Sequence, residues 1–232
     1  MLSSILQGDF NLMSVISLLL QIPIVLLALS MHEAAHGYIA WKMGDPTARN
    51  LGRITLNPIK HLDPIGALCM LLAGYGWAKP VPIYTRNFKD PKKGMALTAL
   101  AGPVSNLMLA FIFMIVRVLF IIIFGALNIP LDEKGMLIYA VINTFLYMGV
   151  YLNVSLAVFN LIPIPPFDGS RIFLTFLPPK IYFGIMKYEK YILIATLVLL
   201  YLNILNYPIE FVTDLVIAAF DGLAHLILGL FV

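Results

Sequence analysis

The sequence predicts an all-α polytopic membrane protein that forms a single membrane-embedded domain over residues 1–232. Of the 232 residues, 61% are hydrophobic and only 12% are charged, which leaves too few polar side chains to cover a soluble domain of this size. Several apolar runs can cross a bilayer, since a spanning helix needs about 20 such residues, and we expect a bundle of about four to six transmembrane helices. The net charge of +3 is too small to suggest nucleic acid as a partner, so the lipid bilayer is the expected environment.

The first three predicted spans form a core of three helices. The first helix runs from Leu12 to about Met43 and stops at Gly44 and Pro46, because glycine and proline commonly end a helix. The second span covers about residues 94–124 and opens with small residues that allow helices to approach closely. The third covers about residues 135–159.

The connection between the first two spans is predicted to return to the membrane without crossing it. Residues 65–77 are an apolar run of 13 residues, too short to span, so we expect a re-entrant or interfacial segment. Prolines punctuate residues 74–84, which favours an extended loop. Residues 49–58 are polar and contain a short strand-like core.

The third span ends in a bend that cannot be regular helix. Three prolines, Pro163, Pro165 and Pro166, interrupt residues 160–171, and proline removes a backbone donor from a helix. A short helix is predicted over residues 172–177, before the next pair of prolines.

Two further apolar helices are predicted after the core, which comprises about residues 14–178. Within the C-terminal region, residues 181–232, we expect a fourth span at 188–206 and a last helix at 208–232.

Polar residues inside the predicted spans need an explanation. Arg117, in the middle of the second span, either snorkels to the membrane surface or pairs with an acid of another helix. Four polar residues of the last helix fall within about 60° on a helical wheel, which indicates a second polar pathway or metal site or, more simply, the wet face of an interfacial or bundle-facing helix: Glu210, Asp214, Asp221 and His225.

The distribution of charge predicts the orientation of the chain. Between Lys42 and Lys93 there are nine Lys or Arg residues against three acids, and the positive-inside rule places such a connection in the cytoplasm. Residues 128–134 then lie outside, and residues 160–190, with four more basic residues, lie inside again. The two cytoplasmic assignments agree with each other.

One motif of the first span carries chemistry. His32, Glu33 and His36 form a His-Glu-x-x-His pattern in an otherwise almost wholly apolar segment. Residues four apart on a helix differ by about 40° around the axis and about 6 Å along it, so both imidazoles can face one metal ion. Glu33 can then take a proton from metal-bound water. Such short patterns also arise by chance, but polar side chains are costly in hydrocarbon, so we expect a metal site here.

A third protein ligand is expected, because hydrolytic zinc sites usually have three and leave a position open for water. Asp168 is favoured because it follows the cytoplasmic end of the third span, in a proline-broken stretch that can line a watery cavity. The alternative is that Asp168 only caps the helix that follows. The other residues of suitable type are His61, Asp63, Cys69, Glu189, Glu210, Asp214, Asp221 and His225.

Together these motifs resemble the site-2 protease family of intramembrane zinc metalloproteases, and in particular its compact prokaryotic branch, which has no PDZ domain. The resemblance extends over about residues 30–171, which is most of the chain, and three motifs occur in the family's order. The likeness is carried by His32-Glu33-Ala-Ala-His36, by Ala101-Gly102-Pro103-Val104-Ser105-Asn106, by Asn160, Pro163 and Phe167-Asp168-Gly169, and by segments 56–66 and 76–82.

The resemblance implies a protease domain with a three-helix catalytic core, in which His32, His36 and Asp168 hold one Zn²⁺ per chain and Glu33 is the base. It also implies that the substrates are membrane-spanning proteins, cut near the cytoplasmic face by a multi-pass protein of a prokaryotic cell membrane. The family's motif has an asparagine at the position of Asn160, which makes that residue the candidate donor to the oxyanion. Capping the helix break is almost as good a role for Asn160.

Two alternatives stay open at this point. The protein could instead be a non-enzymatic polytopic metal-binding carrier or assembly factor, which would need exchangeable metal but not Glu33. Carriers tend to show internal repeats, and the sequence contains none. Residues 76–84, or alternatively residues 54–56, could hold an unwound substrate by adding it as a strand to an exposed edge, or residues 76–84 could be an ordinary surface loop.

Overall fold

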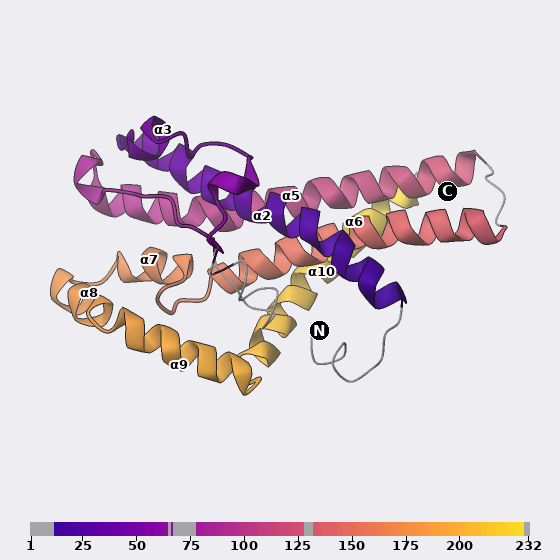
Figure 1. The fold of residues 1–232 in the computed structure, drawn as a ribbon. Helices are drawn as coiled ribbons and strands as arrows, with labels where there is room; N and C mark the ends of the chain where they lie inside the picture. The colour runs from indigo at the N-terminus through magenta and orange to yellow at the C-terminus, as the bar shows by residue number, and fades with distance from the viewer. Residues whose placement is uncertain (1–11, 65, 67–77, 128–131, 230–232) are drawn as a thin grey trace.

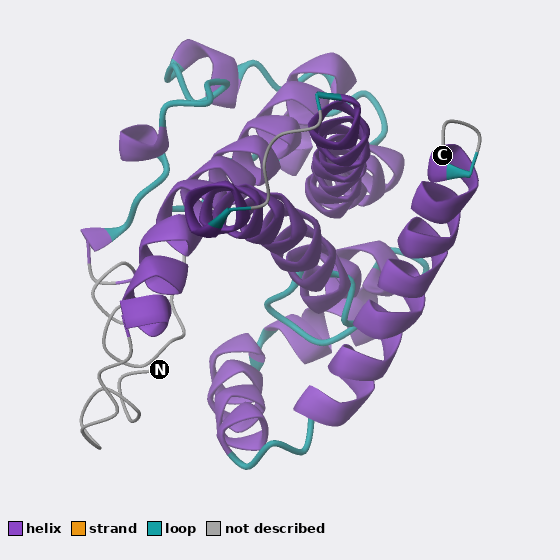
Figure 2. Ribbon diagram, turned by 90° about the vertical axis from the view of Figure 1, so that its right-hand side faces the viewer, coloured by secondary structure: helices purple, strands orange, loops and turns teal. Residues whose placement is uncertain are grey.

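The computed structural model describes residues 12–64, 66, 78–127 and 132–229. The expected re-entrant segment, residues 65–77, lies almost entirely outside the described residues, as does Cys69. The described chain is helical, with loops but no strand between the helices (Figure 2). The elements are α2 (Leu12–Met43), α3 (Thr47–Asn50), η1 (Pro58–Lys60), η2 (Thr85–Asn87), α5 (Pro91–Ala126), α6 (Glu133–Asn160), α7 (Asp168–Leu174), α8 (Pro179–Met186), α9 (Glu189–Tyr201) and α10 (Asn206–Leu228).

Four of these helices are long and apolar enough to cross a membrane, which confirms the predicted all-α polytopic membrane protein. The candidate spans among the described residues are Leu19–Met43, Pro91–Ala126, Glu133–Asn160 and Asn206–Leu228.

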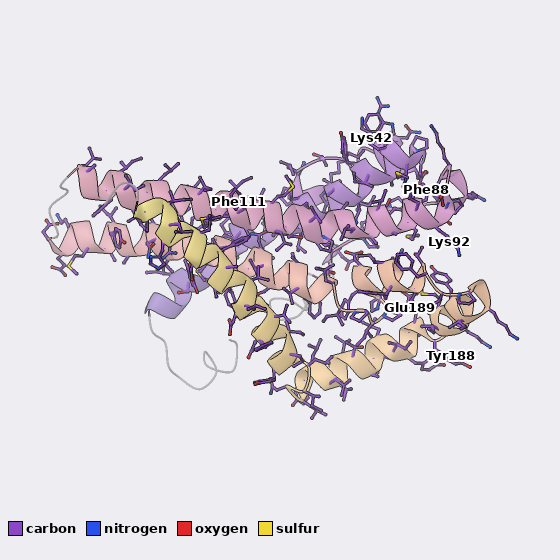
Figure 3. All side chains as sticks on the ribbon, turned by 180° about the vertical axis from the view of Figure 1, so that it is seen from behind. Lys42, Phe88, Lys92, Phe111, Tyr188 and Glu189 are labelled. Atoms are coloured by element: carbon purple, nitrogen blue, oxygen red, sulfur yellow. The ribbon has the colours of Figure 1, made fainter. Side chains whose placement is uncertain are left out.

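Helix α5 is the centre of the bundle. It packs against both α2 and α6, which also contact each other, α7 contacts it, and α10 packs against α5 and α6 (Figure 1). Phe111 of α5, labelled in Figure 3, meets Phe220 of α10 edge to face with ring centroids 6.2 Å apart. The buried core joins the same three helices: Ala110, Met114 and Val118 of α5, Val150 and Val154 of α6, and Ile217 and Ala224 of α10.

Local signals explain where the long helices begin and end. Helix α2 ends as predicted at Met43, because Gly44 has a φ of +118° and glycine adopts this left-handed conformation without steric cost. Asp90 caps α5 by accepting hydrogen bonds from two backbone amides of its first turn, and Asp132 caps α6 by accepting one, from the N–H of Gly135.

The predicted span at residues 188–206 is wrong. Helix α9 has 13 residues, or about 20 Å of helix, whereas the hydrocarbon core is about 30 Å thick. The helix stops because Asn203 takes a φ of +59° and Ile204 N–H bonds back to the carbonyl of Leu199 at 3.0 Å. Asparagine is the residue that most readily replaces glycine in this kind of helix end.

Two smaller predictions also differ from the structure. The helix expected at residues 172–177 begins earlier, at Asp168, and ends at Leu174, because an acidic residue is favourable in a first turn. The strand-like core expected within residues 49–58 is absent from this described segment, where α3 is followed by a turn in which Gly52 has a φ of +62°.

Candidate metal centre

Three side chains that are far apart in the sequence converge where α2 meets the start of α7. Nε2 of His32 lies 3.0 Å, and Nε2 of His36 3.1 Å, from the same oxygen of Asp168, Oδ2. All three potential ligand atoms lie within 4.8 Å of one another. His32 and His36 are 5% and 7% exposed. Among the residues that the structure describes, this is the one group of His, Cys, Asp or Glu side chains able to hold a metal ion. We call it the metal cluster.

The backbone after α6 places Asp168 at this depth. The chain leaves α6 after Asn160 and enters α7 at Asp168. A Cβ atom on Gly169 would collide with the carbonyl groups of Leu161 and Ile162, so only glycine lets the two segments pack this closely. The residue at the cap of α7 is Phe167, and the contacts of the Asp168 carboxylate are with His32 and His36. These contacts favour a ligand role for Asp168 over the capping alternative.

A chain of buried asparagines determines which nitrogen of His32 faces the metal cluster. Asn153 donates through Nδ2 to the carbonyl of Gly149 at 2.8 Å, which leaves its Oδ1 to accept from Nδ2 of Asn106 at 3.1 Å. That amide also donates to the carbonyl of Ala28 at 3.2 Å. Oδ1 of Asn106 is thus an acceptor, and it lies 2.6 Å from Nδ1 of His32.

It follows that Nδ1 of His32 carries a proton and donates it to Asn106, so that in the neutral ring Nε2 presents a lone pair. Both asparagines are fully buried, and their bonds connect α2, α5 and α6. Partners of this kind fix the tautomer and the orientation of metal-binding histidines.

His36 is oriented by the backbone of α5. Its Nδ1 lies 2.7 Å from the carbonyl of Thr98, and because a carbonyl only accepts, Nδ1 is the donor and Nε2 again faces the metal cluster. One turn later, a Cβ atom on Gly102 would lie 2.5 Å from Nε2 of His36 and 2.6 Å from Cε1 of His32. Glycine at 102 therefore makes the space that both imidazoles occupy.

The donor set suits zinc. Asp168 contributes a carboxylate oxygen, Oδ2, which both Nε2 atoms face. Two imidazole nitrogens and one carboxylate oxygen are the ligand types of hydrolytic zinc sites, in which a fourth position stays open. Three Lewis bases that face one another need a cation between them.

Two further predicted site residues have different surroundings. Glu33, half-buried on α2, accepts a hydrogen bond at Oε2 from the backbone N–H of Val81 at 2.9 Å. Asn160, the last residue of α6, donates through Nδ2 to the carbonyl of Leu156 at 2.9 Å, which is a bond within its own helix end. The structure thus shows the capping type of contact for Asn160, and its role towards the oxyanion stays a prediction.

The remaining candidate ligands do not join the metal cluster. Nε2 of His61 donates to the carbonyl of Thr55 at 2.8 Å, and Asp221 pairs with Arg117, which is one of the two roles foreseen for that arginine. Within the described chain the others also lie outside the cluster: Asp63, Glu189, Glu210, Asp214 and His225.

The residues that support the metal cluster were not predicted from the sequence. Asn106 and Gly102 are only part of a motif there, and no role was predicted for Asn153 or the Thr98 carbonyl. A signal was available for the asparagines, because an amide side chain inside an apolar span needs a partner in another helix. The sequence did not say which partner.

Comparisons with known proteins agree with this chemistry. Residues 20–203 match peptidase family M50. A Bacillus subtilis (strain 168) protein named "Putative zinc metalloprotease YwhC" is 43% identical over 179 residues, which are 75% of this chain and 77% of that protein. Two mycobacterial proteins named "Putative zinc metalloprotease Rip2" are more distant. The one from Mycolicibacterium smegmatis is 29% identical over 62% of this chain and 52% of its own length, and the one from Mycobacterium tuberculosis (strain H37Rv) is 27% identical over 78% and 66%. No solved structure matches significantly.

Proposed function

The chain belongs to peptidase family M50 and is a zinc metalloprotease of the membrane, and on that premise we propose that it cuts membrane-spanning proteins close to the cytoplasmic face. The observation that carries the proposal is the convergence of His32, His36 and Asp168 within a helical membrane bundle, with Glu33 beside them on the same helix. This combination suits hydrolysis of a peptide bond that a soluble protease cannot reach. Family membership also decides against the carrier or assembly-factor alternative.

In this proposal one zinc ion per chain is held by Nε2 of His32, Nε2 of His36 and the carboxylate of Asp168. In the neutral tautomer described above, Nε2 of each histidine carries no proton, so these two ligand atoms are ready to bind. When bound, zinc acts as a Lewis acid that makes a water molecule more acidic and polarises a carbonyl group.

Glu33 is proposed as the general base and then the general acid. Its carboxylate accepts a proton from the attacking water and returns it to the amine nitrogen as the carbon–nitrogen bond breaks. A helix offers no free scissile carbonyl, so the substrate must be unwound first. Residues 78–84, the described part of segment 76–84, contain no helix, and they are the proposed place where an unwound substrate is held as an added strand. Crosslinks from these positions to a substrate would support this, and their complete absence would count against it.

The orientation towards the cytoplasm is supported by where the basic residues gather. Lys42, at the end of α2, and Lys92, at the start of α5, lie at the same end of the bundle (Figure 3). Residues 42–93, which are this connection and the helix ends that flank it, hold nine basic residues and three acids, which the positive-inside rule assigns to the cytoplasm. The metal cluster lies on α2 towards this end, since His36 is seven residues before Met43.

The proposed function is tested with purified protein in lipid vesicles that also contain a single-span substrate. Glu33→Gln should keep its zinc and lose cleavage, because the amide cannot accept the proton. His32→Ala should lose zinc, as measured by metal analysis, together with cleavage. If Glu33→Gln cleaves at the wild-type rate, the proposed mechanism is wrong.

A further inference from the structure

The carboxylate of Glu33 is held by a segment that lies far from it in the sequence. The backbone N–H of Val81 donates to Oε2 of Glu33 at 2.9 Å. Val81 is 6% exposed and Glu33 is half-buried, so this hydrogen bond is largely shielded from water. A backbone donor fixed in space is therefore presented directly to the residue that the proposed function makes the base.

The sequence singles out this donor. Pro80 and Pro82 have no backbone N–H, so Val81 carries the single backbone donor within residues 80–82. A residue before a proline is also restricted to extended conformations, and these residues lie outside any helix. Residues 80–82 thus present a single N–H group, in a stiff backbone, to one oxygen of the Glu33 carboxylate.

The upstream end of this segment is tied down. We call residues 78–87 the strap. Lys79 N–H donates to the carbonyl of His61 at 2.8 Å, and Nη2 of Arg53 donates to the carbonyl of Lys79 at 2.7 Å. Arg53 is 8% exposed, and a charged donor makes a stronger hydrogen bond than a neutral one. The residue two positions before Val81 is therefore held on both its N–H and its carbonyl.

The downstream end of the strap is tied to the helix that carries Glu33. Asp45, which is fully buried just beyond α2, accepts hydrogen bonds from the N–H of Tyr84 at 2.7 Å and from Nδ2 of Asn87 at 2.8 Å. Oδ1 of the same carboxylate also accepts from the hydroxyl of Thr47 at 2.5 Å. A displacement of the strap would have to break these bonds together.

Side-chain packing fixes the middle of the strap. A Cβ atom on Gly37 would lie only 3.4 Å from Cγ1 of Val81, so the valine side chain rests on α2 one turn after Glu33. Packing and the two tied ends together determine where the Val81 N–H points.

We propose that the backbone N–H of Val81 is a positioning group for the base, and this inference rests on the proposed function. The N–H holds Oε2 of Glu33 and leaves Oε1 to exchange protons. Water loses a proton to Oε1 as its oxygen bonds to the scissile carbonyl carbon. The carbon–nitrogen bond then breaks as Oε1 returns that proton to the amine. One oxygen serves both transfers, which requires a carboxylate that does not rotate.

The first test compares variants of the full-length protein in lipid vesicles. Val81→Pro removes the N–H and keeps an extended backbone, and its kcat should fall about 100-fold, the usual effect of a misplaced catalytic group. Its zinc content should be that of the wild type, and its KM should change less than about threefold. Val81→Ala, which keeps the N–H, should be at least tenfold faster than Val81→Pro. The proline control lies away from the site: Glu133→Pro changes the first residue of α6, a position at which helices favour proline, and its kcat should stay near that of the wild type.

The second test needs no activity. Exchange of the Val81 amide hydrogen with solvent is followed by nuclear magnetic resonance in the wild type and in Glu33→Ala, and loss of the acceptor should speed exchange at least tenfold. An equal kcat for Val81→Pro and Val81→Ala would overturn the proposal, as would an unchanged exchange rate. If Glu33→Gln still cleaves while Val81 exchange responds to Glu33→Ala, the proposed function fails but the contact stands.

Discussion

Two polar clusters lie within the apolar bundle, and they differ in how their charges are balanced. The metal cluster brings two imidazole nitrogens to one oxygen of Asp168. The second, which we call the arginine cluster, consists of Arg117, Asn143, Tyr147 and Asp221. In it, Nε of Arg117 donates to Oδ1 of Asn143 at 2.9 Å, Nη1 lies 3.8 Å from Oδ1 of Asp221, and the guanidinium carbon is 5.2 Å from the centre of the Tyr147 ring.

The difference separates a functional site from a structural contact. In the arginine cluster a cation meets a neutral amide, an anion and an aromatic face, so every group has a complementary partner within the protein. In the metal cluster three Lewis bases face one another, and their proton-bearing atoms point away, to Asn106 and to the Thr98 carbonyl. Polar groups in a membrane that compensate one another hold helices together, whereas groups that converge uncompensated require a ligand.

Loss of a metal ligand should have the largest effect and should separate the two clusters most clearly. Asp168→Ala removes the anion of the metal cluster, and we expect bound zinc to fall to a small fraction of one ion per chain. Cleavage should fall about 1,000-fold or more, since zinc supplies several kcal/mol of transition-state stabilisation. Asp221→Ala, which removes the anion of the arginine cluster, should retain full zinc. Metal analysis of the two variants measures this difference. Equal zinc content in both would contradict the assignment of one cluster as the metal site and the other as a structural contact.

Loss of space beside the imidazoles should have the next largest effect. In Gly102→Ala the new Cβ would lie 2.5 Å from His36, so helix or imidazole must shift, and we expect kcat to fall about 100-fold. The control is Gly125→Ala on the same helix, where a Cβ atom would meet nothing within 4 Å. Comparable rates in the two alanine variants would show that the close approach at Gly102 is unimportant.

Loss of an orienting asparagine should weaken the metal site without destroying it. Asn106→Ala removes the acceptor of the His32 Nδ1 proton, and partners of this type are worth about 10- to 100-fold in metal affinity. Competition with a chelator measures the affinity. Asn143→Ala makes the same change in the arginine cluster and should leave zinc affinity at its wild-type value, so an equal loss in both variants would refute the assignment.

The smallest effect is expected in the arginine cluster itself. Asp221→Asn keeps the side-chain shape and removes the charge, and polar contacts between membrane helices average about 0.6 kcal/mol. The thermal midpoint in detergent should fall by a degree or two, while zinc content and kcat stay constant. Glu210→Gln, on the same helix but without a partner among the described residues, should not change the midpoint. A loss of zinc in Asp221→Asn would link the two clusters.

The features of the fold that could be predicted from the sequence are those whose cause lies within a few residues of them. The end of α2 at Gly44 and the caps at Asp90 and Asp132 follow from signals within a few residues. The spacing of His32 and His36 is also local, and Asp168 could be added because prolines mark an irregular bend at the same membrane depth. The early end of α9 at Asn203 had a local signal too, but a long apolar run outweighed it.

The support of the metal cluster could not be predicted, because it depends on which helix faces which. Asn106 reaches His32 across 74 residues of sequence and Asn153 across 47. Val81 reaches Glu33 across 48 residues, and no periodicity encodes such a contact. A hydrogen bond between helices can be predicted only when the way in which the helices pack against each other is known.

The shortness of α9 has a consequence for how the protein sits in a cell. With α9 too short to traverse the bilayer, the described helices make four passages, through α2, α5, α6 and α10. An even number returns the polypeptide to the face from which it set out. Reporter enzymes fused ahead of α2 and behind α10 should therefore give the same compartment signal, and a fusion within the turn between α8 and α9 should give the opposite one.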